Sequence, residues 1–215
     1  MTQPVKPRRR YHSPERLERA NATASAVVRA AERLFAESGY AAVSMKQIAA
    51  AAGIAPATLY LHFENKAAIV AAMARAVTEA PDLSVEQVER ATSARQQAAL
   101  GARIQRALNE RAWLVADILK SHSATDPALG LLAAEWSARH LDAVRRGVAA
   151  LAALGKLRRG LDPERAADIL YAVAGTAVYR SLVLERGWSA TEYEEWLADW
   201  MERELVAGGG ADDAR

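Results

Sequence analysis

The chain has 215 residues, 51% of them hydrophobic, and a formal net charge of +2 at pH 7, which suffices for one or two domains with a buried core. It contains no cysteine, which excludes a disulfide framework and any cysteine-based metal site. No apolar h-region follows the basic start and no run of about 20 apolar residues occurs, so we expect a cytoplasmic protein without a signal peptide or a membrane span.

Charge is distributed unevenly along the sequence. Residues 1–70 carry ten basic and five acidic side chains, a net charge of +5, which leaves −3 for the remainder. A basic first third of the chain favours contact with a polyanion. A basic tail that is merely solvated would explain the same net charge. Arg8, Arg9 and Arg10 stand side by side within residues 1–13, a basic arm that we expect to be disordered when free.

The sequence after this arm predicts helices only, because Ala, Leu, Glu and Arg dominate and stretches of alternating Val, Ile and Tyr are missing. A first helix is expected over residues 14–38, and a fourth from Lys66 with Asn65 as its N-cap. Serine and aspartate caps predict later helices near residues 84–107, 110–121, 127–154, 163–186 and 189–206. We expect residues 208–215 to form a flexible tail.

Residues 44–63 have the pattern of two short helices joined by a turn. Ser44 and Gln47 form a capping-box sequence for the first, Gly53 supplies the turn, and Pro56 suits the first position of the second. Such a short second helix is unstable alone and can hold a few side chains toward a DNA groove. A generic helical hairpin has the same spacing, which leaves both interpretations open.

Three segments of this region, in order and at matching spacing, resemble the DNA-binding domain of the TetR (tetracycline-repressor) family. They are Val27–Tyr40 for the first helix, Ser44–Ile54 for the second helix and turn, and Thr58–Lys66 for the recognition helix and the start of the fourth. The resemblance implies an all-α fold. Residues 14–66 would form an N-terminal three-helix helix-turn-helix domain, and residues 67–207 a helical C-terminal ligand-binding and dimerisation domain.

The resemblance also implies DNA contacts. Ser44 would cap the second helix beside a phosphate, and Tyr60 would point from the recognition helix to a phosphate or a base. Minor-groove insertion and simple solvation both remain open for the three arginines of the arm. The implied contacts are Arg8, Arg9, Arg10, Ser44, Lys46, Pro56, Ala57, Thr58, Tyr60, His62 and Lys66.

One departure concerns the start of the recognition helix. The family often has Ser, Lys and Gly where this chain has Ala55, Pro56 and Ala57. The change removes a cap and polar side chains that could read bases. We therefore expect specificity to depend on few direct contacts, on DNA shape and on the arm.

Residues from Asp162 onward resemble the last two helices of many family members, which pair with the same helices of a second subunit. Small and apolar residues at helical spacing fit such a surface, and burial within one subunit would explain them equally. We expect a homodimer on a palindromic operator, whose half-sites lie about 34–36 Å apart. The candidate interface residues are Leu170, Val173, Ala177, Val178, Trp196 and Trp200.

The resemblance further implies that the middle helices enclose a pocket for a small-molecule inducer. We expect an apolar or aromatic ligand that shifts the population of conformations and releases the DNA. Each candidate lining residue could instead belong to the core or the surface. They are Trp113, Asp117, His122, Trp136, Arg139, His140, Tyr171 and Tyr179.

Other classes of function are weaker. The four histidines lack metal-ligand spacing, and the sequence contains no glycine-rich phosphate loop, nucleophile elbow or zinc-protease motif. We expect no enzyme activity, no cofactor and no metal. A constitutive DNA-binding regulator without a ligand, or an activator, remains an alternative to the ligand-released repressor.

Overall fold

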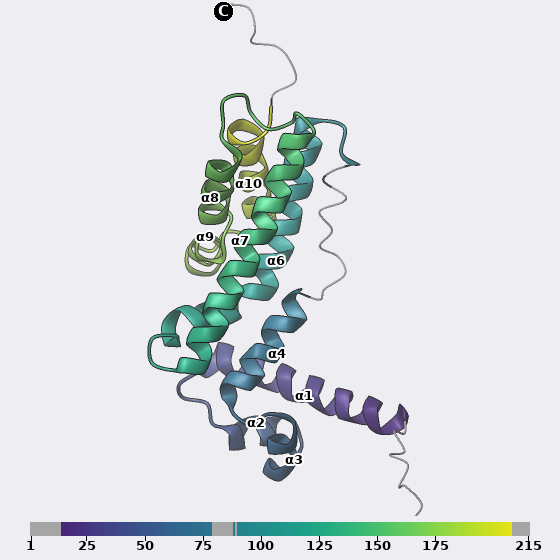
Figure 1. The fold of residues 1–215 in the computed structure, drawn as a ribbon. Coiled ribbons are helices and arrows are strands. Elements are labelled where there is room, and N and C mark those ends of the chain that lie inside the picture. The colour runs from purple at the N-terminus through teal and green to yellow at the C-terminus, as the bar shows by residue number, and fades with distance from the viewer. Residues whose placement is uncertain (1–13, 79–87, 89, 208–215) are drawn as a thin grey trace, which may run out of the picture. The chain divides into compact units, whose positions relative to one another are not determined.

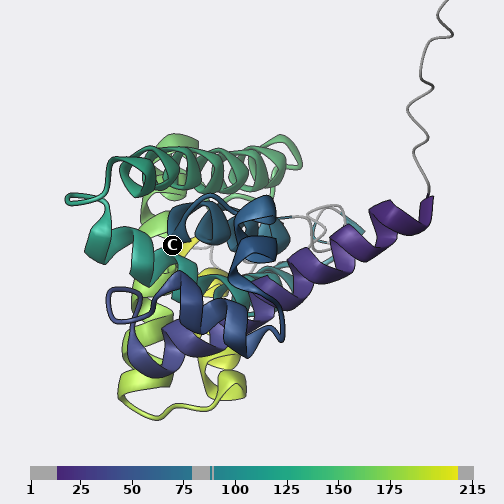
Figure 2. The ribbon, with the colours of Figure 1, turned by 90° about the horizontal axis from the view of Figure 1, so that it is seen from below.

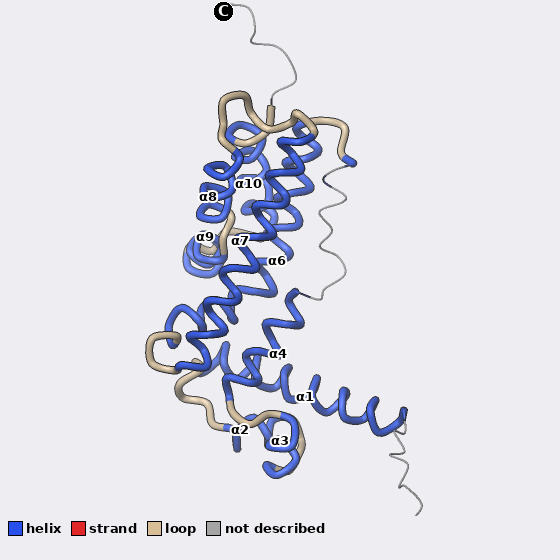
Figure 3. The backbone as a smooth tube through the Cα atoms, in the orientation of Figure 1, coloured by secondary structure: helices blue, strands red, loops and turns tan. Residues whose placement is uncertain are grey.

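The computed structural model describes residues 14–78, 88 and 90–207. Within these ranges every regular element is a helix, apart from one isolated bridge between Leu157 and Val206 (Figure 3). The all-α prediction is therefore confirmed. The chain divides into two compact units, residues 1–70 and 71–215. The basic arm, the cap predicted at Ser84 and the C-terminal tail lie outside the described residues.

The first unit contains α1 (Pro14–Ser38), α2 (Met45–Ala51), α3 (Pro56–His62) and the first turn of α4 (Lys66–Thr78). Only the C-terminal half of α1 contributes to the core, and its N-terminal half projects from α2 and α3 (Figures 1 and 2). Gly39 ends α1 with φ of 79°, the left-handed conformation that glycine adopts without a steric penalty.

The second unit is built around two long helices, α6 (Ala94–His122) and α7 (Pro127–Ala153), which lie side by side (Figure 1). Against them pack α8 (Pro163–Val173), the short α9 (Thr176–Tyr179) and α10 (Ala190–Glu204). A π-helix over Arg180–Glu185 continues α9.

Helix α6 corrects the prediction of two helices that meet near residues 108–109. It runs unbroken through Asn109, which is fully buried. The Asn109 side chain does not compete with the helix backbone, because Nδ2 donates to the carbonyl of Ala174 at 2.9 Å and to Tyr193 Oη at 3.0 Å. Tertiary hydrogen bonds therefore keep this polar residue inside the helix.

The predicted single helix over residues 163–186 is also corrected, because it breaks after Ala174. A side chain at Gly175 would bring Cβ within 2.8 Å of the Tyr171 carbonyl, so the break needs glycine. The segment Pro163–Glu185 is long and apolar enough to cross a membrane by length and composition alone, because its most apolar window has a mean hydropathy of 1.3, yet only 17% of that window is buried. It therefore presents an apolar surface.

Candidate functional site

The helix-turn-helix of the first unit is held together by its caps and its turn. The Ser44 hydroxyl accepts the Gln47 N–H at 3.3 Å, and the Gln47 Oε1 accepts the Ser44 N–H at 2.8 Å, which confirms the capping box. Gly53 has φ of 70°. The Ile54 N–H then donates to the Ala49 carbonyl at 3.0 Å, so the turn directs the chain tightly into α3.

A small apolar core fixes α3 against α2. Ile48, Ala49 and Leu59 are all fully buried, and Phe63 at the end of α3 is 6% exposed. Leu59 lies within α3 and Phe63 is its C-cap with an extended backbone, and both side chains are buried. The face of α3 opposite Leu59 is left for other contacts.

The outer face of α3 is exposed and largely apolar. Ala55, Pro56 and Ala57 are exposed at its start. Ala55 occupies the N-cap position of α3 and forms no side-chain hydrogen bond there, because alanine has no polar side-chain atom. Tyr60 is 56% exposed and Leu61 is 86% exposed. Thr58 and His62 are half-buried.

Leu61 is an exposed residue of α3 that was not predicted as a DNA contact from the sequence. Its position two residues after the buried Leu59 places it about 200° around the helix from that residue, away from the core. An apolar side chain held in solvent beside Tyr60 is suited to contact with a thymine methyl group. The i, i+2 spacing from Leu59 in the short helix was the signal that could have identified it.

Lys66 has a role in the fold beside the phosphate contact expected of it. Its Nζ donates to the Tyr40 carbonyl at 2.6 Å and lies 4.3 Å from the centroid of the Tyr40 ring. The Asn65 side chain accepts the Ala68 N–H at 2.9 Å, which confirms the predicted cap. Lys66 thus ties the start of α4 to the loop after α1. Lys46 and Ser44 are exposed at the start of α2.

The second unit contains a cavity of about 530 Å³. This volume falls within the range of small-molecule sites, about 300–1,000 Å³. Three of the residues predicted for a pocket, Trp136, Arg139 and His140, line it, together with Leu170 from the predicted dimer surface. The other five do not line it: Trp113, Asp117, His122, Tyr171 and Tyr179.

Those five residues contribute to packing and ion pairing. Asp117 pairs with Arg180 of the π-helix, and His122 Nδ1 lies 3.1 Å from the Ile118 carbonyl. Tyr179 is buried against Tyr193, with ring centroids 5.0 Å apart. Trp113 packs against the core of the second unit, and the Tyr171 ring lies tilted against the His140 ring, with ring centroids 4.9 Å apart.

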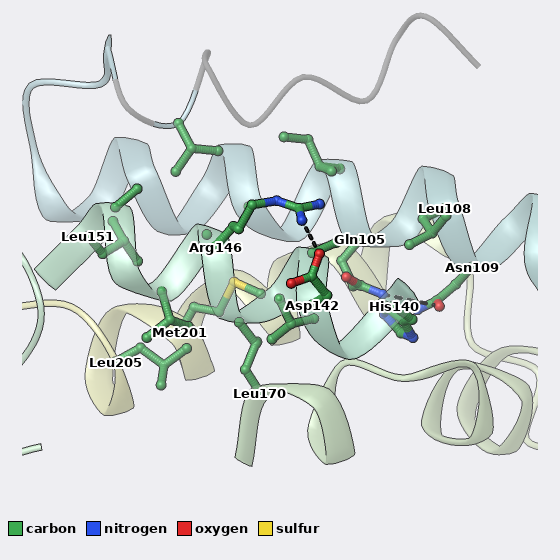
Figure 4. Close-up of a pocket in the computed structure, with 18 of the residues that line it drawn as sticks. Gln105, Leu108, Asn109, His140, Asp142, Arg146, Leu151, Leu170, Met201 and Leu205 are labelled. Atoms are coloured by element: carbon green, nitrogen blue, oxygen red, sulfur yellow. Dashed lines mark hydrogen bonds and ion pairs between the residues drawn. The ribbon is translucent and has the colours of Figure 1, made fainter. Parts of the chain in front are cut away.

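The cavity is lined mainly by apolar side chains of α6, α7 and α10, with three uncharged polar residues grouped toward one end (Figure 4). Gln105, Asn109 and His140 lie at that end, and Leu151 and Leu205 lie at the other. Burial lowers the pKa of His140 below its usual range, so its ring is neutral near pH 7. Neither Asn109 nor Gln105 was predicted from the sequence; their side chains are joined by a 3.3 Å hydrogen bond.

Charged residues at the cavity occur as exposed ion pairs. Arg139 donates to Glu135 at 2.5 Å, and Arg146 donates to Asp142, each pair one helical turn apart on α7. The described residues contain no group of three or more His, Cys, Asp or Glu side chains placed to hold a metal ion. The site is therefore suited to an apolar molecule with a few hydrogen bonds.

The predicted dimer residues lie in the last part of the second unit. Val173, Val178, Trp196 and Trp200 are half-buried against the core, and Ala177 is exposed. Two further apolar residues of the same segment, Ile169 and Leu184, are 39% and 45% exposed. This segment thus combines apolar character with solvent exposure.

Comparison with known proteins gives a family for the first unit. Residues 27–73 match the profile described as bacterial regulatory proteins, tetR family. No curated protein sequence matches the chain.

Solved structures extend the similarity beyond this region. SmeT from Stenotrophomonas maltophilia, in complex with triclosan, is 25% identical with a TM-score of 0.68, and the match covers 87% of this chain and 93% of SmeT. NalD from Pseudomonas aeruginosa, the secondary repressor of the MexAB-OprM multidrug efflux pump, is 25% identical with a TM-score of 0.65, over 88% and 98% of the two chains.

FadR from Bacillus subtilis, a transcriptional regulator in complex with stearoyl-CoA, shares the fold at 18% identity. Its TM-score is 0.66, over 83% of this chain and 97% of FadR. The likeness therefore includes the helical second unit as well as the helix-turn-helix.

Proposed function

We propose that this chain, whose residues 27–73 match the tetR family of bacterial regulatory proteins, is a homodimeric repressor of that family that binds a palindromic operator and is released by a small molecule. The observation that carries the proposal is the exposed face of α3. Core residues hold this short helix rigidly, while Tyr60 and Leu61 remain in solvent. Rigid presentation of a few side chains is what groove recognition requires.

The chemistry of that face supports recognition through few direct hydrogen bonds. Ala55, Pro56 and Ala57 have no side-chain donor, whereas Leu61 and Pro56 offer apolar contact to thymine methyl groups. Thr58, Tyr60 and His62 supply the polar contacts of α3. Ser44 and Lys46 at the start of α2, Lys66 at the start of α4, and Arg8, Arg9 and Arg10 of the arm would contact phosphates and sugars, which fix register without reading sequence.

A dimer follows from the need for two such helices. Pseudo-palindromic sites present half-sites one helical turn apart, about 34–36 Å, to two symmetry-related recognition helices. The segment Pro163–Glu185, which leaves Ile169 and Leu184 exposed, offers a surface for a second copy, and α10 adds Trp196 and Trp200. Burial of this surface would give the contact that a stable two-fold dimer needs.

Release by a small molecule is supported by the cavity of about 530 Å³ in the second unit. Two similar structures hold ligands, triclosan in SmeT and stearoyl-CoA in FadR. A ligand that binds one conformation more tightly than another shifts the population by its difference in affinity. Repression is favoured over activation by the similarity to NalD, a repressor.

The test is selection of binding sites from random DNA by the full-length protein. The proposal predicts enriched sites with two inverted half-sites about one helical turn apart. Enrichment of single, non-repeated sites would contradict the dimeric mode of binding, and no enrichment would contradict sequence-specific binding. Salt titration of the selected site should give a steep decrease of affinity, since phosphate contacts release counterions.

A further inference from the structure

Two unpartnered polar atoms distinguish the cavity of the second unit. Among buried side-chain nitrogen and oxygen atoms of the described residues, only Gln97 Oε1 and His140 Nε2 have no hydrogen-bond partner. Both residues line the cavity. Buried polar groups are nearly always hydrogen-bonded, so this coincidence points to groups on a ligand as the missing partners.

The roles of these two atoms restrict the ligand. The Gln97 Nε2 donates to the Ala91 carbonyl at 3.4 Å, which fixes the amide orientation and leaves Oε1, an acceptor, without a donor. The ring of His140 is neutral, so Nε2 is an acceptor or a donor according to tautomer. The ligand must therefore donate a hydrogen bond at Gln97 and can do either at His140.

The two atoms lie toward opposite ends of the cavity. The Ala91 carbonyl that accepts from Gln97 also accepts from Lys156 Nζ at 2.5 Å, so Gln97 lies where α7 has just ended at Ala153. His140 precedes that end by 13 residues, about 20 Å along the axis at 1.5 Å per residue. Figure 4 shows His140 at the Asn109 end, away from Leu151.

The wall between these ends is apolar and contains an opening left by glycine. A Cβ atom added at Gly147 would meet nothing within 4 Å, although Gly147 lines the cavity. Ile104, Leu108 and Val144 contribute apolar surface there. Because Arg139 and Arg146 are already paired with acidic neighbours, a charged ligand group would gain no dedicated counterion in this wall.

We propose that the effector is an uncharged, extended molecule with an apolar middle and a hydrogen-bonding group at each end, one donating to Gln97 Oε1 and the other bonding to His140 Nε2. The inference rests on the proposed ligand-released function and specifies its ligand class. An extended shape fits because the cavity follows α6 and α7 over several turns, while its volume is only about 530 Å³.

The test uses four probes with the same chain length on the full-length protein: 1,12-dodecanediol, 1-dodecanol, dodecane and dodecanoate. Binding is measured by the shift in Tm and by the fluorescence of tryptophan, since Trp136 lines the cavity. The diol should bind about tenfold more tightly than the alcohol, because one neutral hydrogen bond contributes about a factor of ten. The alcohol should in turn exceed both the alkane and the carboxylate.

Variants locate the end of the ligand that lies at Gln97 and test the apolar wall. Gln97→Leu should reduce diol affinity about tenfold and leave alkane affinity unchanged. The substitution does not leave the Ala91 carbonyl without a hydrogen bond, because Lys156 still donates to it. Gln96→Leu is the matched control, because Gln96 is the neighbouring position of α6, is exposed and does not line the cavity, and it should retain diol binding. Gly147→Leu should fill the cavity and abolish binding of every probe, while DNA binding persists.

Equal affinity for diol and alkane, or tightest binding of the carboxylate, would overturn the ligand class, and so would binding of no probe. Failure of the proposed function gives a different result. In that case the diol binds and responds to Gln97→Leu, but selected DNA is not released at saturating diol. Separate measurement of Tm and of DNA affinity therefore distinguishes the two failures.

Discussion

Asn109 shows how one buried amide joins three helices of the second unit. Its Nδ2 donates to the Ala174 carbonyl at the break after α8 and to Tyr193 Oη on α10. Burial also raises the pKa of Tyr193 to about 12, so the phenol stays protonated throughout the physiological range. This polar network is satisfied at the centre of an otherwise apolar core.

Replacement of Asn109 by leucine should therefore destabilise the fold by about 2–4 kcal/mol, because buried partners lose their hydrogen bonds. Thermal unfolding would show a decrease in Tm of roughly 5–15 °C. Asn21→Leu, the same change at an exposed position of α1, is the control and should change Tm by only about a degree or two. An equal effect of the two substitutions would contradict the network.

His140 predicts a pH dependence of stability. Burial lowers its pKa in the folded state, whereas the unfolded chain titrates near the usual value of about 6.5. The unfolded state therefore binds more protons below about pH 7, so stability falls as the pH decreases through that range. His140→Phe should flatten the curve of Tm against pH between about pH 7 and 5, and an unchanged curve would count against the buried neutral ring.

Helix α3 is the element in which sequence and function meet most directly. The prediction of α2, the turn and α3 from Ser44, Gly53 and Pro56 is confirmed, because each residue has a local conformational reason for its position. The missing cap at Ala55 is confirmed as well. Local signals of this kind can be read without knowledge of the tertiary structure.

The later elements were less predictable because distant contacts decide them. Asn109 lies inside α6 owing to partners 65 and 84 residues away, and the break at Gly175 depends on close approach to the Tyr171 carbonyl. The same limit applies to the cavity. Trp136 and His140 were identifiable as unusual residues, whereas Gln97, Asn109 and Gly147 acquire meaning only from the packing of α6 against α7.

At this scale, Ala55→Ser supplies the side-chain cap that α3 lacks. We expect it to stabilise the protein by about 0.5–2 kcal/mol and to increase DNA affinity, since a serine hydroxyl at the helix start can also contact a phosphate. Chemical denaturation and DNA titration measure the two effects. Ala57→Ser, two residues beyond the N-cap, is the control and should produce neither; a decrease in stability with Ala55→Ser would refute the assignment of Ala55 as the cap position.

At the scale of the whole molecule, the proposed dimer joins an exposed apolar surface to the requirement for two recognition helices. Leu184 is 45% exposed on the π-helix and Ile169 is 39% exposed on α8. Leu184→Glu should weaken self-association by placing a charge in the interface. Sedimentation equilibrium should detect monomers, with a parallel loss of affinity for palindromic DNA.

Leu131→Glu is the matched control for that experiment, because Leu131 is 77% exposed on α7 and lies outside the proposed surface. It should leave the dimer intact. Dimers of undiminished stability in Leu184→Glu would place the interface elsewhere.

The central claim, that the exposed face of α3 reads DNA, is tested most directly by fluorescence anisotropy titrations of a selected operator with the wild type, Leu61→Ala and Leu131→Ala. Leu61→Ala should lose about tenfold in affinity for the operator, since one base contact contributes about 1–3 kcal/mol. Its loss of affinity for unrelated DNA should be much smaller. Leu131→Ala should bind as the wild type does. Wild-type affinity and sequence preference in Leu61→Ala would contradict the account.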